Sequence, residues 1–141
     1  MRCKSQSGQA IVEFCVILPL FLIFLVGITE LSLVLYDKAV ITNASREAAR
    51  AGILDKTPRL TDAEITTVVN NYCSGRLITF SASSSVTTIT RTAANPSASP
   101  PTRGTLSVQV TYAYHWLAFP NFVSGAATIS LGAATVMQFE N

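Results

Sequence analysis

An apolar segment near the N-terminus is the feature that most limits what this chain can fold into. No charged side chain occurs from Phe14 to Ile28, and after Thr29 and Glu30 the apolar character resumes as far as Tyr36. A helix over Phe14 to Ile28 alone would be about 22 Å long, whereas one continuing to Tyr36 would be about 35 Å long. Since the hydrocarbon core of a bilayer is about 30 Å thick, the longer helix can cross it. The sequence therefore predicts a transmembrane helix over residues 9–36.

The distribution of charge predicts how this helix is oriented. Arg2 and Lys4 precede Gly8, and basic residues next to a transmembrane helix favour the cytoplasmic side. We therefore expect the N-terminus in the cytoplasm, the helix in the inner membrane and the C-terminus exported. The whole chain has ten basic and eight acidic residues. Because Arg2 and Lys4 account for the excess, no basic surface remains that would indicate a nucleic-acid partner.

The helical pattern continues beyond the membrane segment. The stretch "YDKAVITNASREAARAGIL" has no proline, and its first glycine is Gly52, so residues 37–57 are predicted to be a helix extension and connector. We interpret Arg46 and Arg50 as part of a solvated face. The opposite face carries a narrow stripe of small and apolar residues suited to close packing: Val34, Ile41, Ala44, Ala48 and Ala51.

The remaining residues, 58–141, are predicted to form an exported α+β domain. The stretch "TDAE" from Thr61 to Glu64 is a capping box, which indicates a short second helix ending near Gly75. Residues alternate between polar and apolar afterwards, which predicts a small antiparallel sheet. The strand-like stretches are "RLITF", "SVTTITRT", "TLSVQVTYAYH" and "ATISLGAATVMQF", with a Pro/Ser loop at 93–104.

No catalytic residue, cofactor or metal ligand is predicted. The chain has one histidine, no acid at a catalytic spacing from it, no phosphate-binding loop and no Cys/His metal spacing. Cys73 is alone in the exported part, so it is either a buried thiol, the interpretation we favour, or one half of a bridge between subunits.

The aromatic residues near the end of the sequence suggest a partner surface. Tyr112 and Tyr114 are in phase along a predicted strand, which favours a place in the core. Trp116, Phe119 and Phe122 fall in a predicted loop and are therefore candidates for contact with a partner.

The residues around Gly8 have a distinctive order. Gly8 is followed five positions later by Glu13 and then by Phe14. This arrangement resembles the processing site of type IV pilin-like proteins. The resemblance implies that a prepilin peptidase removes the leader, residues 1–8, so that the mature chain begins at Gln9.

The resemblance extends along the helix to the TadE-like family of the Tad/Flp pilus system. It is carried by Glu13-Phe14, Pro19, "GITE" from Gly27 to Glu30, "ASREAARAG" and the closing "AATVMQFE". It implies a minor pilin, or pseudopilin, that acts in pilus assembly or initiation and hence in surface adhesion. The implied partners are the prepilin peptidase, the major pilin and TadF-like pseudopilins. The subunit's place at the tip, along the shaft or only in the membrane is left open.

The resemblance also suggests roles for single residues. After cleavage, the carboxylate of Glu13 would meet the new positive N-terminus of a neighbouring subunit, so that Glu13 and Phe14 set the register of assembly. Pro19 is expected to kink or loosen the helix because proline has no backbone N–H and clashes with the preceding turn. Glu30 is either a second pairing group or, as we prefer, a residue facing lipid headgroups.

Other interpretations of the same residues remain. The chain could be a single-pass envelope protein whose exported domain binds a ligand, with Glu13 merely an acid at the membrane interface. A secretory signal peptide would need a small-residue cleavage site after Ile28, and none is convincing. A TadF-type pseudopilin would share the processing chemistry and differ in its C-terminal features.

Overall fold

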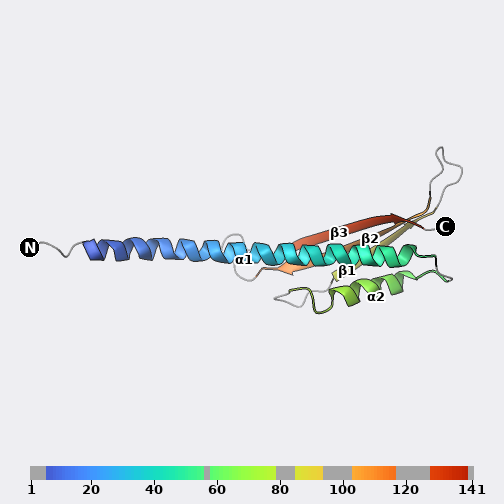
Figure 1. Cartoon of the computed structure of the whole chain (residues 1–141), viewed down its shortest axis with the longest axis horizontal. Coiled ribbons are helices and arrows are strands. Elements are labelled where there is room, and N and C mark those ends of the chain that lie inside the picture. The colour runs from blue at the N-terminus through green and yellow to red at the C-terminus, as the bar shows by residue number, and fades with distance from the viewer. Residues whose placement is uncertain (1–5, 56–57, 79–84, 94–102, 117–127, 140–141) are drawn as a thin grey trace, which may run out of the picture.

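The computed structural model describes residues 6–55, 58–78, 85–93, 103–116 and 128–139. In these residues a long helix is followed by a short helix and three strands, which confirms the predicted α+β fold (Figure 1). The elements are α1 (Gln6–Ile53), α2 (Asp62–Cys73), β1 (Ser85–Thr92), β2 (Thr105–His115) and β3 (Thr128–Gln138).

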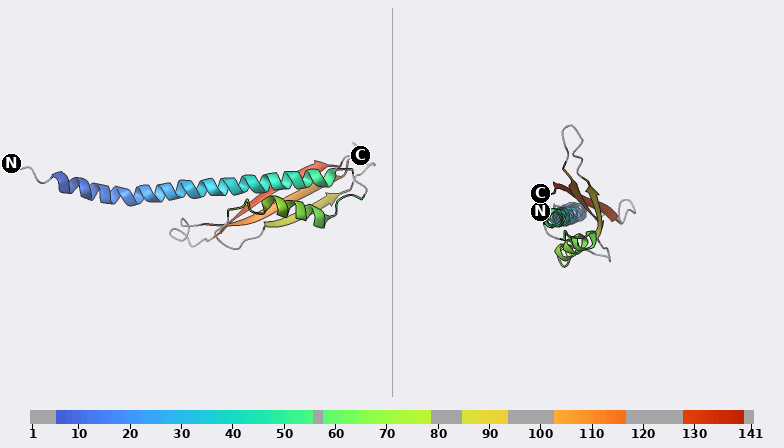
Figure 2. Two further views of the ribbon diagram at one scale, coloured as in Figure 1. Left: turned by 60° about the horizontal axis from the view of Figure 1, so that its bottom comes forward. Right: turned by 90° about the vertical axis from the view of Figure 1, so that its right-hand side faces the viewer.

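Helix α1 determines the shape of the molecule. Its 48 residues correspond to a length of about 72 Å. The N-terminal half extends away from the other elements, while the C-terminal half lies against the sheet and α2 (Figures 1 and 2). Pro19 lies inside α1, which nevertheless continues to Ile53. One intrahelical hydrogen bond is missing at this point because proline has no N–H.

The strands form an antiparallel sheet in the order β1-β2-β3. The central strand alternates as predicted, and one of its faces is completely buried: Leu106, Val108, Val110, Tyr112 and Tyr114. In β3, Leu131 and Ala133 are buried, but Ile129 near the start of the strand is 39% exposed. The expectation of a strand at "RLITF" is wrong for residues 76–78, which form a turn and an irregular segment, and residues 79 and 80 lie outside the described residues.

The small-residue stripe of α1 packs within the chain. Ile41, Ala44 and Ala48 are fully buried against the sheet and α2, and Val34 is almost so. Alanine side chains let the helix axis come close to the sheet because they extend only to Cβ. The packing is also close at Gly52, where a Cβ atom would lie 2.8 Å from Ile65 Cδ1 and would also overlap Leu106.

The short helix begins at the predicted capping box. The backbone N–H of Glu64 donates to Thr61 Oγ1 at 3.3 Å, and the backbone N–H of Thr61 donates to Glu64 Oε2 at 2.7 Å. Ile65, Val69 and Cys73 form its buried face. After the helix, Gly75 adopts a left-handed conformation with φ 71°, as a helix stop requires. Arg91 of β1 ties this helix to the sheet by donating to Asp62 Oδ1 at 2.7 Å.

Candidate membrane and assembly segment

The N-terminal half of α1 presents large apolar side chains to its surroundings. The side chains of Ile11, Phe14, Val16 and Leu20 are all more than 60% exposed. Among the described residues, α1 is a helix long and apolar enough to cross a membrane, and its most apolar window is not covered by the rest of the chain. Exposing this much apolar surface to water would be costly, at about 25 cal/mol per Å². The segment is therefore suited to act as a membrane anchor.

The predicted processing and register residues lie together in the first turns of α1. Gly8, Gln9, Glu13 and Phe14 are all exposed. The Gln9 side-chain amide donates to Glu13 Oε1 at 3.1 Å, across one helical turn. A Cβ atom placed on Gly8 would meet nothing within 4 Å. The second helix and the sheet cover none of these four residues, so a peptidase or a neighbouring subunit could reach them.

The prediction that Glu30 faces lipid headgroups is wrong. Glu30 is only 2% exposed and lies where the end of β2 passes alongside α1. Burial raises the pKa of Tyr114 above its usual value, and the nearby charges of Glu30 and Asp37 raise it further. The sequence interpretation treated α1 as an isolated helix, in which the glutamate would point outward. The strand that covers Glu30 comes from more than eighty residues later in the chain, so no local pattern could reveal this contact.

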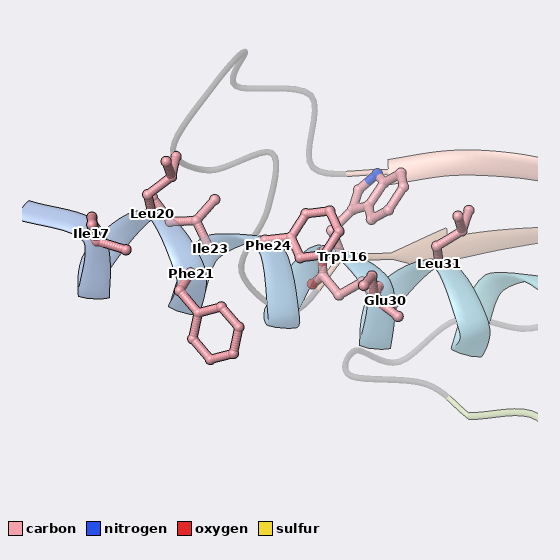
Figure 3. A pocket seen from close by; sticks show the side chains of 10 residues that line it. Ile17, Leu20, Phe21, Ile23, Phe24, Glu30, Leu31 and Trp116 are labelled. Atoms are coloured by element: carbon pink, nitrogen blue, oxygen red, sulfur yellow. The ribbon is translucent and has the colours of Figure 1, made fainter. Parts of the chain in front are cut away.

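Trp116, the first of the three candidate partner residues, is described by the structure. It follows β2, is half-buried, and packs edge-to-face on Tyr114 with ring centroids 5.8 Å apart. Phe119 and Phe122 lie outside the described residues. Among the described residues, Trp116 and the face of α1 between Ile17 and Leu31 line an open, apolar groove with a volume of about 820 Å³ (Figure 3). We refer to it below as the Trp116 groove.

Asp37 is a buried residue that the sequence analysis did not single out. Its Oδ1 accepts a hydrogen bond from the Ile78 backbone N–H at 2.9 Å, and its Oδ2 has no hydrogen-bond partner among the described residues. The next residue, Lys38, donates from Nζ to the Gly132 carbonyl of β3. The signal in the sequence was an acid-base pair directly after the apolar run. These contacts fasten the domain to α1 at the point where the predicted membrane segment ends.

Cys73 is buried, as the favoured interpretation expected. The residue is 5% exposed. Burial raises the pKa of its thiol, although a hydrogen bond with Ser85 and the charge of Arg76 act in the opposite direction. A thiol that is both buried and protonated is a poor candidate for a bridge between subunits. Among the described residues, no three side chains of His, Cys, Asp or Glu are grouped as a metal site would require.

The N-terminal part of the chain is similar to a known protein family. Residues 8–50 match the family model of the TadE-like protein, which confirms the resemblance predicted from the sequence. The match covers most of α1 and stops three residues before that helix ends. No curated protein and no solved structure matches the chain.

Proposed function

Because residues 8–50 match the TadE-like family model, we propose that this chain is a minor pilin of a Tad-type pilus. It acts by assembly with other pilins rather than by catalysis, in pilus assembly or initiation, and through the pilus in surface adhesion. The observation that carries this proposal is the division of α1. The family match falls on a helix whose first half is apolar and exposed and whose second half is covered by the chain's own domain.

In the proposed arrangement the leader lies in the cytoplasm and the domain on the exported side of the inner membrane. The basic residues of the leader support this orientation. The attachment of the domain to α1 also supports this orientation, because the contacts of Asp37 and Lys38 lie directly beyond residue 36. Because the domain also covers Glu30 and Val34, the part of α1 that crosses the membrane ends near Glu30, on the exported side.

Cleavage by the prepilin peptidase is proposed between Gly8 and Gln9. This bond lies in the first turn of α1, which begins at Gln6. A peptidase needs an extended backbone, so the first turn has to unwind before cleavage. Glycine favours this step because it is about 1 kcal/mol less stable than alanine inside a helix. The open space around Gly8 also leaves room for a protease.

Glu13 is proposed to set the axial register of neighbouring subunits. A charge at the bilayer centre costs about 2.5–3.5 kcal/mol on insertion scales, and less near the interface. Glu13 lies close to the start of the helix, where the helix dipole also favours an acid. Pairing with the α-amino group of a neighbouring Gln9 would offset the remaining cost at one axial shift only. Phe14 lies beside Glu13 on the exposed surface and would contact the same neighbour.

The first experiment measures the mass of the N-terminus. The full chain is expressed with and without a prepilin peptidase of the Tad type, and the intact mass is determined. We expect a chain that begins at Gln9 only when the peptidase is present, and no cleavage in Gly8→Leu, whose bulky side chain would obstruct the protease. Thr67→Leu, an exposed change on α2, serves as the control and should be cleaved normally.

A chain that keeps residues 1–8 in the presence of active peptidase would contradict the pilin proposal. It would favour the alternative of an envelope protein with a plain anchor and an exported ligand-binding domain. To distinguish TadE-type from TadF-type roles, photo-crosslinking from position 14 in cells carrying the whole pilus system would identify the neighbouring pilin directly.

A further inference from the structure

The Trp116 groove joins the exported domain to the apolar surface of the membrane segment. In the described part of the chain, it is lined by the face of α1 from Ile17 to Leu31 and by the indole of Trp116 (Figure 3). At the groove, Glu30 is buried, whereas Phe21 and Phe24 are more than half exposed. The side chain of Glu30 is thus covered by the domain, and the groove becomes more exposed along α1 toward its N-terminus.

The position of the groove along α1 can be compared with the thickness of a bilayer. Gln9 and Glu30 are twenty-one residues apart, which corresponds to about 32 Å of helix. The hydrocarbon core is about 30 Å thick. If the start of the helix lies at the cytoplasmic interface, Glu30 and Trp116 lie at the opposite interface, and Ile17 to Phe24 lie in the hydrocarbon.

We propose that the Trp116 groove is a lipid-binding surface, which takes an acyl chain of a phospholipid in the leaflet on the exported side. Trp116 then lies at headgroup level, and the domain contacts the membrane surface. This inference depends on the membrane insertion proposed above, but it requires neither cleavage after Gly8 nor assembly with other pilins.

Two observations favour lipid over another protein as the occupant. The α1 side of the groove is continuous with the exposed face of the membrane segment, so the lipid that surrounds Phe21 also reaches the groove. Tryptophan is enriched at membrane interfaces because its ring is apolar and its N–H can reach water or headgroups. Trp116 is half-buried and stacked on Tyr114, so its ring is held against α1 at the level where the membrane would end.

The chain offers a direct probe because Trp116 is its only tryptophan. The full chain is placed in phosphatidylcholine/phosphatidylglycerol vesicles at a low ratio of protein to lipid, so that each chain is isolated. The vesicles contain lipids with a quencher either near the head of the acyl chain or near its end. We expect blue-shifted Trp116 emission and stronger quenching by the shallow quencher than by the deep one.

Two variants in a Trp116→Phe background provide controls. Phe21→Trp places the probe on the membrane segment and should be quenched most by the deep lipid. Ala63→Trp places it on the exposed surface of α2 and should not be quenched. A Trp116 that neither lipid quenches, while Phe21→Trp is quenched, would overturn the lipid site and leave the membrane anchor intact. If Phe21→Trp were not quenched either, membrane insertion itself would be wrong, and the lipid site with it.

Discussion

At the scale of single residues, Asp37 makes a polar contact between α1 and the segment after α2. The carboxylate receives the Ile78 N–H and is completely buried, next to the end of the predicted membrane segment. Asp37→Ala would leave that N–H, on the half-buried Ile78, without its partner, and the loss of a partner costs a buried donor about 1–3 kcal/mol. We expect this loss in the free energy of unfolding, measured by urea denaturation in detergent micelles.

The matched control for Asp37 is Glu47→Ala, an exposed acid on the same helix. Exposed substitutions of this kind change stability by about 0.5 kcal/mol or less. Asp37→Asn keeps an acceptor for Ile78 and should lose less than Asp37→Ala. If Asp37→Ala were as stable as Glu47→Ala, the contact with Ile78 would not be a significant link between the domain and α1.

The thiol of Cys73 gives a second prediction at this scale. Only the thiolate is alkylated, and burial raises the pKa of Cys73 above its usual value, so less thiolate is present at any pH near 8. In a variant with Cys3 and Cys15 replaced by serine, iodoacetamide should label the native domain much more slowly than the denatured chain. Mass spectrometry measures the labelling rate. Fast labelling, or a disulfide-linked dimer under mild oxidation, would support the bridge that we did not favour.

At the scale of secondary-structure elements, close packing between α1, α2 and β2 depends on Gly52. Gly52→Ala adds a methyl group that overlaps Leu106 and lies 2.8 Å from Ile65 Cδ1. Overpacking typically destabilises a protein by about 1–3 kcal/mol. The higher helix propensity of alanine offsets at most about 1 kcal/mol of this loss. We therefore expect a net loss of stability, visible as a lower urea midpoint.

Gly132→Ala is the control for Gly52, since a Cβ at Gly132 meets nothing within 4 Å. It should leave the midpoint nearly unchanged or raise it slightly. A Gly52→Ala variant as stable as the parent would mean that α2 and the sheet move apart from α1 without cost. The packing of the three elements would then be looser than the buried stripe of alanines indicates.

Elements whose signals are local could be predicted from the sequence. The capping box of α2, the alternation along β2 and the length of α1 each depend on neighbouring residues, and each is present in the structure. The short "RLITF" stretch misled because β-rich composition alone does not provide a pairing partner. Burial of Glu30 and Asp37 could not be predicted, because their partners lie on β2 and after α2, at separations that no periodicity encodes.

At the scale of the whole molecule, α1 is one continuous helix whose two halves lie in different surroundings. The first half is exposed and apolar, and the second half packs against the sheet and α2. Its second half is held by the chain's own sheet, including a hydrogen bond of 2.8 Å between Ser45 Oγ and Thr135 Oγ1. The small-residue stripe that suited close helix packing is used within the chain, so it is not available to neighbouring pilins. Most of the exposed large apolar side chains of α1 lie on its first half, which carries Glu13 and Phe14, so contacts between proposed subunits are expected mainly there.

This restriction makes Glu13 the decisive test of assembly. Glu13→Ala removes the only charged side chain between Gln9 and Thr29, so membrane insertion should persist, as should cleavage after Gly8. In an assembled bundle, however, the α-amino group of a neighbouring Gln9 would lose its partner. A hydrogen bond to a charged group contributes about 1.5–3 kcal/mol, so incorporation should fall on the order of tenfold or more. Quantitative immunoblots of sheared pili and membranes measure the ratio of this subunit in pili to that in membranes.

Glu47→Ala, which removes an exposed acid from the half of α1 that the domain covers, should assemble normally. A cleaved Glu13→Ala chain that enters pili as well as the parent would show that register is set by apolar contacts such as those of Phe14, and that Glu13 is only an acid at the membrane interface.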